Sequence, residues 1–303
     1  MNKKLFIITA VFISISTLFW CISLFTQKTV VIEEVPAQEY ENVVIPEPIK
    51  NNIYDDKEEI NKSEHDKQYN GYMAIVMDDL GYGYENKFEL FKRLKEKNLK
   101  ITMSIIPGLY NTKKAHDEAY ENGFEIMAHI PMETKNIVAQ ETNVIKINQK
   151  RDDIIIKLNN MLKELKHVKG ANNHQGSLAT SDKSTMLTVL TFLKRNNLYF
   201  VDSLTTSDSV VKNISGVLNT QYMARDIFMD NKNEHEYIKE QLDKAVAISL
   251  KRGVSISICH VRKNTIDVLE NYLPELIKEK NIKLLFVSEI LKDKKKFSLT
   301  RGF

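Results

Sequence analysis

The chain of 303 residues has few of the residues that identify several common protein classes. Its two cysteines, Cys21 and Cys259, are too few for a disulfide framework or a cysteine-rich zinc module. Only 10 glycines are present, and no glycine-rich phosphate loop follows the first expected strand, which argues against Rossmann and P-loop folds. The net charge of +3 gives no general attraction to nucleic acid. We therefore expect no nucleic-acid partner and a function carried by one specific site.

One long uncharged segment, Leu5 to Phe25, stands near the N-terminus behind Lys3 and Lys4. It has about 21 residues, enough to cross a hydrocarbon core of roughly 30 Å. We therefore expect residues 1–27 to be a signal-anchor transmembrane helix, with the rest extracytoplasmic, on the periplasmic side of a bacterial inner membrane or at the cell surface. The alternatives are a cleaved signal peptide, which the lack of a small-residue cleavage site disfavours, and a buried core helix.

The composition divides the remainder of the chain into three parts. Residues 28–70 are rich in Glu, Asn, Lys and Asp and hold three of the six prolines, which is typical of a flexible stalk. The apolar run Tyr72 to Met77 then opens a folded domain, which we place at residues 71–293. Residues 294–303 are expected to form a basic C-terminal tail.

Apolar segments with the lengths of strands alternate with segments of helical periodicity. The expected strands are Tyr72–Met77, Ile101–Ile106, Phe124–His129, Val168–Ala171, Leu198–Val201, Val254–Cys259 and Ile282–Val287. The expected helices are Glu85–Lys97, Lys113–Asn122, Asp152–Lys166, one that begins at Ser181, Glu234–Arg252 and Asn264–Lys280. This alternation predicts an α/β fold with a parallel sheet, either open or closed into a barrel. We favour the barrel because no glycine-rich phosphate loop is present.

Polar side chains collect where these strands end. Because the carboxyl ends of parallel strands meet on one face of the sheet, we expect these side chains to lie close together. Singly, each would more often be a turn residue, a helix cap or a satisfied buried imidazole. Their shared placement favours a site. The residues are Asp78, Asp79, His129, Asn172, Asn173, His174, Asp202, Ser203 and His260.

The types of these residues suit a catalytic divalent metal. Such a metal takes about three protein ligands from imidazole nitrogen and carboxylate oxygen and leaves a position open. Asp79, His129 and His174 fit that description. A second carboxylate and a further histidine, Asp78 and His260, are then available as general base and general acid.

Five ordered motifs resemble the divergent polysaccharide deacetylases, a branch of the NodB-like carbohydrate esterases. The likeness covers Tyr72 to Leu291. The motifs are Ile75-Val76-Met77-Asp78-Asp79-Leu80-Gly81, Ala128-His129-Ile130-Pro131-Met132-Glu133, Asn172-Asn173-His174-Gln175-Gly176-Ser177, Phe200-Val201-Asp202-Ser203 and Arg225-Asp226-Ile227-Phe228-Met229-Asp230-Asn231.

The resemblance implies a NodB-like, distorted (β/α)7-type barrel that removes N-acetyl groups from amino sugars with a divalent metal, zinc above all. It implies that Asp78 is the base, Asp79 a ligand and His260 the acid. One departure is clear, because Glu133 stands where those relatives have the second histidine of a His-x-x-x-His pair. His174 is then expected to supply the missing imidazole.

Five further residues are expected beside the metal or the substrate: Asn173, Asp202, Arg225, Asp226 and Glu133. Arg225 and Asp226 could orient Asp78 or His260, although a structural ion pair explains them equally well. The same alternative stands for Asp202. Glu133 is a surface carboxylate, a ligand or a substrate contact.

The function favoured by the sequence is a metal-dependent deacetylase that acts on an N-acetylated cell-envelope glycan. A barrel without activity, serving as a glycan-binding or envelope-scaffolding module, is the alternative. A phosphoesterase on the same scaffold is less favoured, because a two-metal site would need more carboxylates.

Overall fold

The computed structural model of the chain describes residues 68–83, 88–136 and 141–292. The expected anchor at 1–27, nearly all of the stalk and the tail at 294–303 lie outside these residues. Among the helices that are described, none is both long and apolar enough to cross a membrane. The fold reported below is that of the domain expected at residues 71–293.

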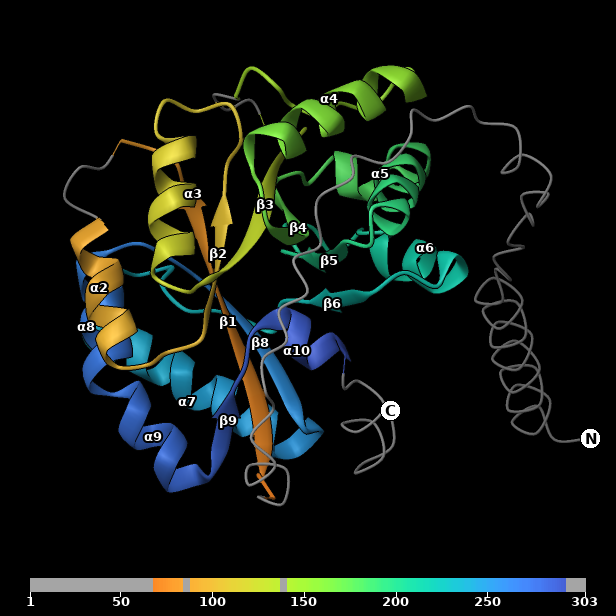
Figure 1. The fold of residues 1–303 in the computed structure, drawn as a ribbon. Coiled ribbons are helices and arrows are strands. Elements are labelled where there is room, and N and C mark those ends of the chain that lie inside the picture. Colours follow the sequence, from red (N-terminus) through yellow and green to blue (C-terminus); the bar gives the residue numbers. More distant parts are fainter. Residues whose placement is uncertain (1–67, 84–87, 137–140, 293–303) are drawn as a thin grey trace, which may run out of the picture. The chain divides into compact units, whose positions relative to one another are not determined.

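Strands and helices alternate along most of this domain (Figure 1). The strands are β1 (Gly71–Leu80), β2 (Ile101–Ile105), β3 (Glu125–Met132), β4 (Val168–Gln175), β5 (Tyr199–Asp202), β6 (Tyr222–Ala224), β7 (Ile227–Phe228), β8 (Val254–His260) and β9 (Ile282–Leu284). The helices are α2 (Phe88–Glu96), α3 (Thr112–Glu121), α4 (Arg151–Glu164), α5 (Lys183–Arg195), α6 (Val211–Leu218), α7 (His235–Arg252), α8 (Lys263–Asn271), α9 (Leu273–Lys280) and α10 (Val287–Lys292), with a 3-10 turn at Ala179–Ser181.

All strands pair in parallel, in the order β6-β5-β4-β3-β2-β1-β8-β7, and β9 adds to β1. The two edge strands, β6 and β7, are joined by only two residues, Arg225 and Asp226. These two residues bond to strands on opposite sides of the sheet. The Arg225 amide donates to Asp202 O of β5 over 3.0 Å, and the Asp226 amide donates to Ile256 O of β8 over 2.8 Å. The sheet must therefore curl until its edges approach each other.

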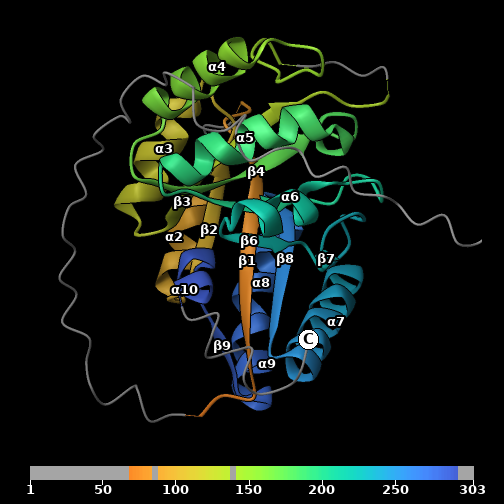
Figure 2. The same ribbon diagram turned by 90° about the vertical axis from the view of Figure 1, so that its right-hand side faces the viewer.

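The predicted parallel α/β fold is confirmed, in the form of this curled sheet. In the described residues no ladder of hydrogen bonds joins β6 to β7, so the sheet does not close into the barrel that the sequence favoured, and only one chain segment spans the gap. Outside the curve, α4 and α5 pack side by side over β3 and β5, and α7 packs over β8 (Figure 2).

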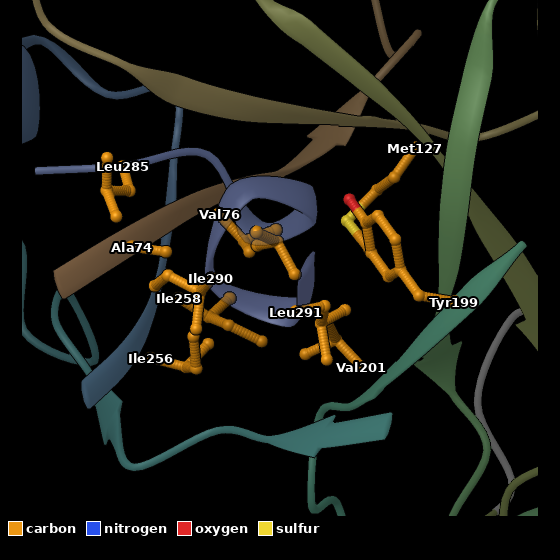
Figure 3. Close-up of a cluster of buried hydrophobic side chains, with 11 residues drawn as sticks. Ala74, Val76, Met127, Tyr199, Val201, Ile256, Ile258, Leu285, Ile290 and Leu291 are labelled. Carbon is orange, nitrogen blue, oxygen red and sulfur yellow. The ribbon is translucent and has the colours of Figure 1, made fainter. Parts of the chain in front are cut away.

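The inner face of the curled sheet is built from alternate residues of its strands. Ala74 and Val76 of β1 point inward beside Ile256 and Ile258 of β8, and Val201 of β5 joins them (Figure 3). Alternation on a pleated strand sends every second side chain to the same side. The next inward positions toward the carboxyl ends are therefore where a site would stand.

Helix α10 closes the other end of the curled sheet. Its Ile290 and Leu291 belong to the same apolar cluster (Figure 3). At the same end Glu125, the first residue of β3, is buried. It accepts hydrogen bonds from Tyr199 Oη at 2.8 Å and from the Ser288 amide at 3.2 Å. A buried carboxylate needs such donors, so this closed end has a structural role.

The last expected strand and the last expected helix differ from the structure. The last strand was expected to run to Val287, but β9 ends at Leu284 and Val287 begins α10. The long helix expected at Asn264–Lys280 is divided into α8 and α9 at Tyr272. Pro274 explains the break, because it has no amide hydrogen to donate to the preceding turn.

The close packing of Gly170 on β4 inside the curled sheet can be tested by substitution. A Cβ at this position would overlap the ring of Tyr199, whereas a Cβ at Gly216 in α6 would meet nothing. Gly170→Ala should lower the melting temperature by about 2–10 °C, as overpacked cores do. Gly216→Ala, the matched control, should raise it by about 2–4 °C, because Ala suits a helix interior. Thermal unfolding of both variants decides the matter, and shifts of the same sign would contradict the packing.

Candidate metal centre

The residues expected to carry chemistry meet at the carboxyl end of the inner face. Asp78 of β1 and His260 of β8 are register partners on neighbouring strands. On the inward face they follow Val76 and Ile258 and lie nearer the carboxyl ends of the strands. We call this end of the curled sheet the mouth. Asp78 is buried and His260 partly buried. The sheet therefore places the expected base and acid side by side above the apolar core.

Asp79 joins this site because the backbone of β1 is irregular there. Neighbouring residues of a strand normally point to opposite faces, so Asp78 and Asp79 should diverge. Asp79 instead has a φ of 63°, and the pairing register of β1 with β2 shifts between Met77 and Leu80. Such an irregularity redirects side chains and is common beside functional sites. It brings two consecutive carboxylates to one mouth.

Alternation along β4 separates its consecutive polar residues. Asn172 and His174 share the inward face with Gly170, whereas Asn173 points away and accepts a hydrogen bond from the Ser203 amide at 2.9 Å. On β3, His129 is the register partner of Asn172. The strand continues past His129 to Met132, beyond the end expected from the sequence. His129 and His174 thus reach the site from adjacent strands.

Three potential ligand atoms form a nearly equilateral triangle. Asp79 Oδ1 lies 3.2 Å from His129 Nε2 and 3.0 Å from His174 Nδ1, and the two nitrogens are 3.2 Å apart. Three ligands at about 2.0–2.1 Å from one ion would be separated by roughly 2.9–3.4 Å for bond angles between octahedral and tetrahedral values. The triangle has the dimensions of a metal centre.

The hydrogen bonds of His129 fix which of its nitrogens is free to bind a metal. Its Nδ1 lies 2.7 Å from Asn172 Oδ1, which also accepts from Ser104 Oγ at 2.6 Å. The amide nitrogen of Asn172 donates to Asp78 at 2.9 Å, so its oxygen must face the histidine. His129 therefore carries its proton on Nδ1 and turns the Nε2 lone pair toward Asp79.

Glu141 acts on the other imidazole. Its Oε1 lies 3.2 Å from His174 Nε2, out of line for a full hydrogen bond, and accepts one from Tyr82 Oη. A carboxylate beside Nε2 favours the proton on that nitrogen and leaves Nδ1 as a lone pair. His174 Nδ1, His129 Nε2 and Asp79 Oδ1 are then three acceptors that face one another.

Three acceptors at these distances repel one another unless a cation lies among them. Protons on the histidines can supply part of this positive charge. Burial alone would raise the pKa of Asp79, but hydrogen bonds from the surrounding histidines hold it well below its usual range. Burial alone would lower the pKa of His129, but the neighbouring carboxylates raise it. A divalent cation would satisfy all three atoms at once. The residues present therefore fit a divalent metal with two imidazole ligands and one carboxylate ligand.

His260 stands beside the triangle with a carboxylate behind it. Its Nδ1 lies 2.9 Å from Asp230 Oδ1, and its Nε2 lies 3.3 Å from Asp79 Oδ2. Burial opposes protonation, but hydrogen bonds to Asp230 and Asp79 outweigh it and raise the pKa of His260 to about 9. The fully buried Asp230 also accepts from Thr265 Oγ1 at 2.9 Å. The surroundings of His260 thus stabilise its protonated form, and its Nε2 faces Asp79.

Asp78 is the carboxylate suited to accept a proton. Burial raises the pKa of Asp78, since the charged form loses its hydration, while His129 works in the opposite direction. Its oxygens lie 2.9 and 3.2 Å from Asn172 Nδ2. A carboxylate with a raised pKa is a better general base near neutral pH than an exposed one.

The other expected residues lie around the site without entering the triangle. Asp202 Oδ1 accepts the Leu204 amide at 2.9 Å, and Arg225 Nε donates to Ser203 O at 2.7 Å. Asn173, Asp202 and Arg225 therefore all bind one loop that follows β5.

Asp226 and Glu133 lie away from the ligand atoms. Asp226 pairs with Arg252 and accepts the Ile256 amide at 2.9 Å, which supports the structural alternative left open for it. Glu133 Oε2 accepts the Ile147 amide at 2.8 Å, so it holds the chain after β3 rather than replacing a histidine ligand.

Three residues at the site had no role assigned from the sequence. Asn172 stands in one of the five family motifs, and alternation along a longer β4 would have selected it over Asn173. Asp230 stands in another of these motifs, but nothing in the sequence pairs it with His260, which lies 30 positions away. Glu141 carries no local signal, because a loop brings it to His174.

Comparisons with known proteins give one family and one fold. A family model described as divergent polysaccharide deacetylase matches residues 75–291. An uncharacterized protein of Haemophilus influenzae is 31% identical over 204 residues, 67% of this chain and 71% of that protein. The uncharacterized YibQ of Escherichia coli is 26% identical over 206 residues, 68% and 63% of the two chains. A crystal structure of an uncharacterized Agrobacterium tumefaciens protein shares the fold, with a TM-score of 0.69 at 17% identity, covering 74% of this chain and 90% of that chain.

Glu141 predicts a change in metal affinity. Glu141→Gln should weaken zinc binding about tenfold, the lower end of what a lost outer carboxylate costs, because Gln keeps an acceptor oxygen but not the charge. Glu133→Gln is the control, since that side chain accepts a backbone amide elsewhere. Competition against a chromophoric chelator measures both dissociation constants. Equal affinities in the two variants would remove Glu141 from the metal centre.

Proposed function

The chain belongs to the divergent polysaccharide deacetylase family, and from this premise we propose that it is a metal-dependent carbohydrate deacetylase. It removes N-acetyl or similar acyl groups from a glycan of the cell envelope. The observation that carries the proposal is the triangle of Asp79, His129 and His174, flanked by a buried carboxylate on one side and a protonated imidazole on the other. Family membership alone would support only the fold class.

Zinc is the metal we propose, held by His129 Nε2, His174 Nδ1 and Asp79 Oδ1. Zinc accepts imidazole nitrogen and carboxylate oxygen together, and three protein ligands leave a position for water or substrate. When bound, the cation supplies Lewis acidity, which lowers the pKa of water and polarises the amide carbonyl.

The protein side chains divide the proton transfers of amide hydrolysis. Asp78 takes one proton from the attacking water while the water oxygen forms a bond to the carbonyl carbon. His260 gives its Nε2 proton to the nitrogen as the carbon–nitrogen bond breaks, so that an amine and a carboxylic acid leave, and the proton on Asp78 then restores His260. Asp230 holds the Nδ1 proton of His260 and keeps Nε2 aimed at the leaving group.

The envelope location in this proposal rests on the expected anchor at residues 1–27. A domain tethered outside the cytoplasm would meet N-acetylated glycans of the envelope as its nearest polymeric substrates. The metal site itself does not select among these glycans, because its residues address only the acyl group and the attacking water. The sugar sequence would be recognised by the loops around the mouth.

Removal of both histidine ligands predicts loss of metal and of activity together. The full chain should bind one zinc per molecule, and His129→Ala/His174→Ala should bind none and release no acetate from N-acetylglucosamine oligosaccharides. Elemental analysis and an acetate assay provide the two measurements. Wild-type protein that stays metal-free under zinc loading would refute the proposal. Wild-type protein that holds zinc and binds the oligosaccharides but releases no acetate would instead make this a glycan-binding module.

Asp78→Asn predicts a different outcome, in which metal and activity separate. The variant should keep its zinc, since Asp78 is not in the triangle, and its kcat should fall about 10²–10⁴-fold because the proton acceptor is gone. Asp208→Asn, at an exposed ion pair with Lys135, is the control and should retain full activity. Single-turnover acetate release on zinc-loaded protein measures the effect, and full activity of Asp78→Asn would exclude it as the base.

A further inference from the structure

Leu204 has a backbone conformation that is unusual for its residue type. Nine non-glycine residues in the described chain have positive φ, and five of them are Asn, which tolerates the left-handed region well. Leu204, with a φ of 48°, is the one aliphatic residue among these nine. A bulky side chain makes this conformation unfavourable, so it persists only where the surroundings enforce it.

Hydrogen bonds on both sides of Leu204 enforce the conformation. Its amide donates to Asp202 Oδ1 over 2.9 Å, and its carbonyl accepts from Arg225 Nη2 over 3.1 Å. At the preceding Ser203, the carbonyl accepts from Arg225 Nε over 2.7 Å and the amide donates to Asn173 Oδ1 over 2.9 Å. Three side chains therefore hold two consecutive backbone units in place.

One end of this loop borders the proposed base. Ser203 Oγ accepts from Asn172 Nδ2 at 3.3 Å, and the same amide donates to Asp78. Ser203 Oγ also donates to Asn173 O over 2.9 Å. Leu204 is thus one residue removed from the hydrogen-bonded group that holds the base.

The side chain that holds the Leu204 carbonyl leads to the proposed acid. The guanidinium of Arg225 stacks over Phe228, with Cζ 5.3 Å from the ring centroid. Phe228 in turn packs edge-on against the ring of His260, with centroids 5.2 Å apart. Leu204 therefore stands on the rim of the mouth between the neighbours of Asp78 and those of His260.

The side chain of Leu204 stays 38% exposed, so its own packing does not explain why an aliphatic residue is held there. Strained residues that the surroundings over-determine gather at ligand contacts. We propose that Leu204 is a substrate-contact residue whose side chain packs against an aliphatic part of the glycan, either the C–H face of a sugar ring or the methyl group of the acyl substituent. The substrate class rests on the function proposed above.

The experiment exploits the strain, because the right substitution should separate stability from function. Leu204→Asn suits the left-handed region and removes the aliphatic surface. In the zinc-loaded full chain, it should keep the melting temperature or raise it by about 2–4 °C. It should also raise the KM for acetate release from N-acetylglucosamine oligosaccharides about tenfold, as lost apolar contacts do.

Two controls bracket this result. Leu204→Met keeps an apolar side chain and should stay within about threefold of wild type in KM, since Met replaces Leu well. Val217→Ala truncates another exposed aliphatic residue, on α6, and should leave KM unchanged. An unchanged KM in Leu204→Asn would overturn the proposal. A clear loss of melting temperature in that variant would also overturn it, because Leu204 would then be a structural residue.

A binding measurement keeps this proposal distinct from the proposed reaction. Calorimetric titration of wild type and Leu204→Asn with the same oligosaccharides needs no turnover. If wild type binds but releases no acetate and Leu204→Asn binds about tenfold more weakly, the contact stands and the reaction fails. If wild type releases acetate and both proteins bind alike, the reaction stands and the contact fails. Absence of binding and turnover in wild type overturns both.

A second substrate distinguishes the two aliphatic surfaces. Leu204→Ala is compared on N-acetyl and N-propionyl forms of the oligosaccharide. If Leu204 contacts the acyl methyl group, the shorter side chain should shift the ratio of kcat/KM toward the N-propionyl form by several-fold. If it contacts the sugar ring, kcat/KM should fall equally for both substrates. A kcat/KM equal to that of wild type on both substrates would contradict either contact.

Discussion

Mutual repulsion among acceptor atoms around Asp79 is the constraint on which the site depends. Asn172 accepts from Nδ1 of His129, so in the neutral imidazole Nε2 meets the Asp79 carboxylate as a lone pair 3.2 Å away. His174 Nδ1 completes the triangle at 3.0 Å. Protons on the histidines relieve part of this repulsion, and a divalent cation would satisfy all three atoms at once. The same buried polar groups that make the mouth reactive therefore make it dependent on charge compensation.

The curled sheet places these groups through strand alternation and one exception to it. Along β1 and β8 the inward positions are apolar deep inside and polar at the mouth, so Asp78 and His260 follow the packed neighbours Val76 and Ile258. Asp79 breaks the alternation through its positive φ. Alternation alone would give one carboxylate per strand at this level. The irregularity supplies the second, which allows separate residues to serve as ligand and base.

The sequence was sufficient to predict the fold class and five of the residues at the mouth, because the carboxyl ends of parallel strands must converge. It did not distinguish Asn172 from Asn173, because it expected a shorter strand: a β4 that reaches Gln175 turns Asn172 inward and Asn173 outward. It also missed Asp230 and Glu141. Their roles follow from contacts with His260 and His174 across loops, and local sequence patterns carry no information about such contacts.

The sequence located three residues around the site without deciding their roles. They are Asn173, Asp202 and Arg225. All three lie near the mouth as expected, and each makes a hydrogen bond to the backbone of Ser203 or Leu204. Buried or partly buried polar groups would cost stability there without partners. Because the loop satisfies them, the energy of these bonds holds Leu204 in a conformation it would not adopt alone. Rigid presentation of a side chain at the rim lowers the entropy lost when a ligand binds, which is a reason for a fold to maintain such strain.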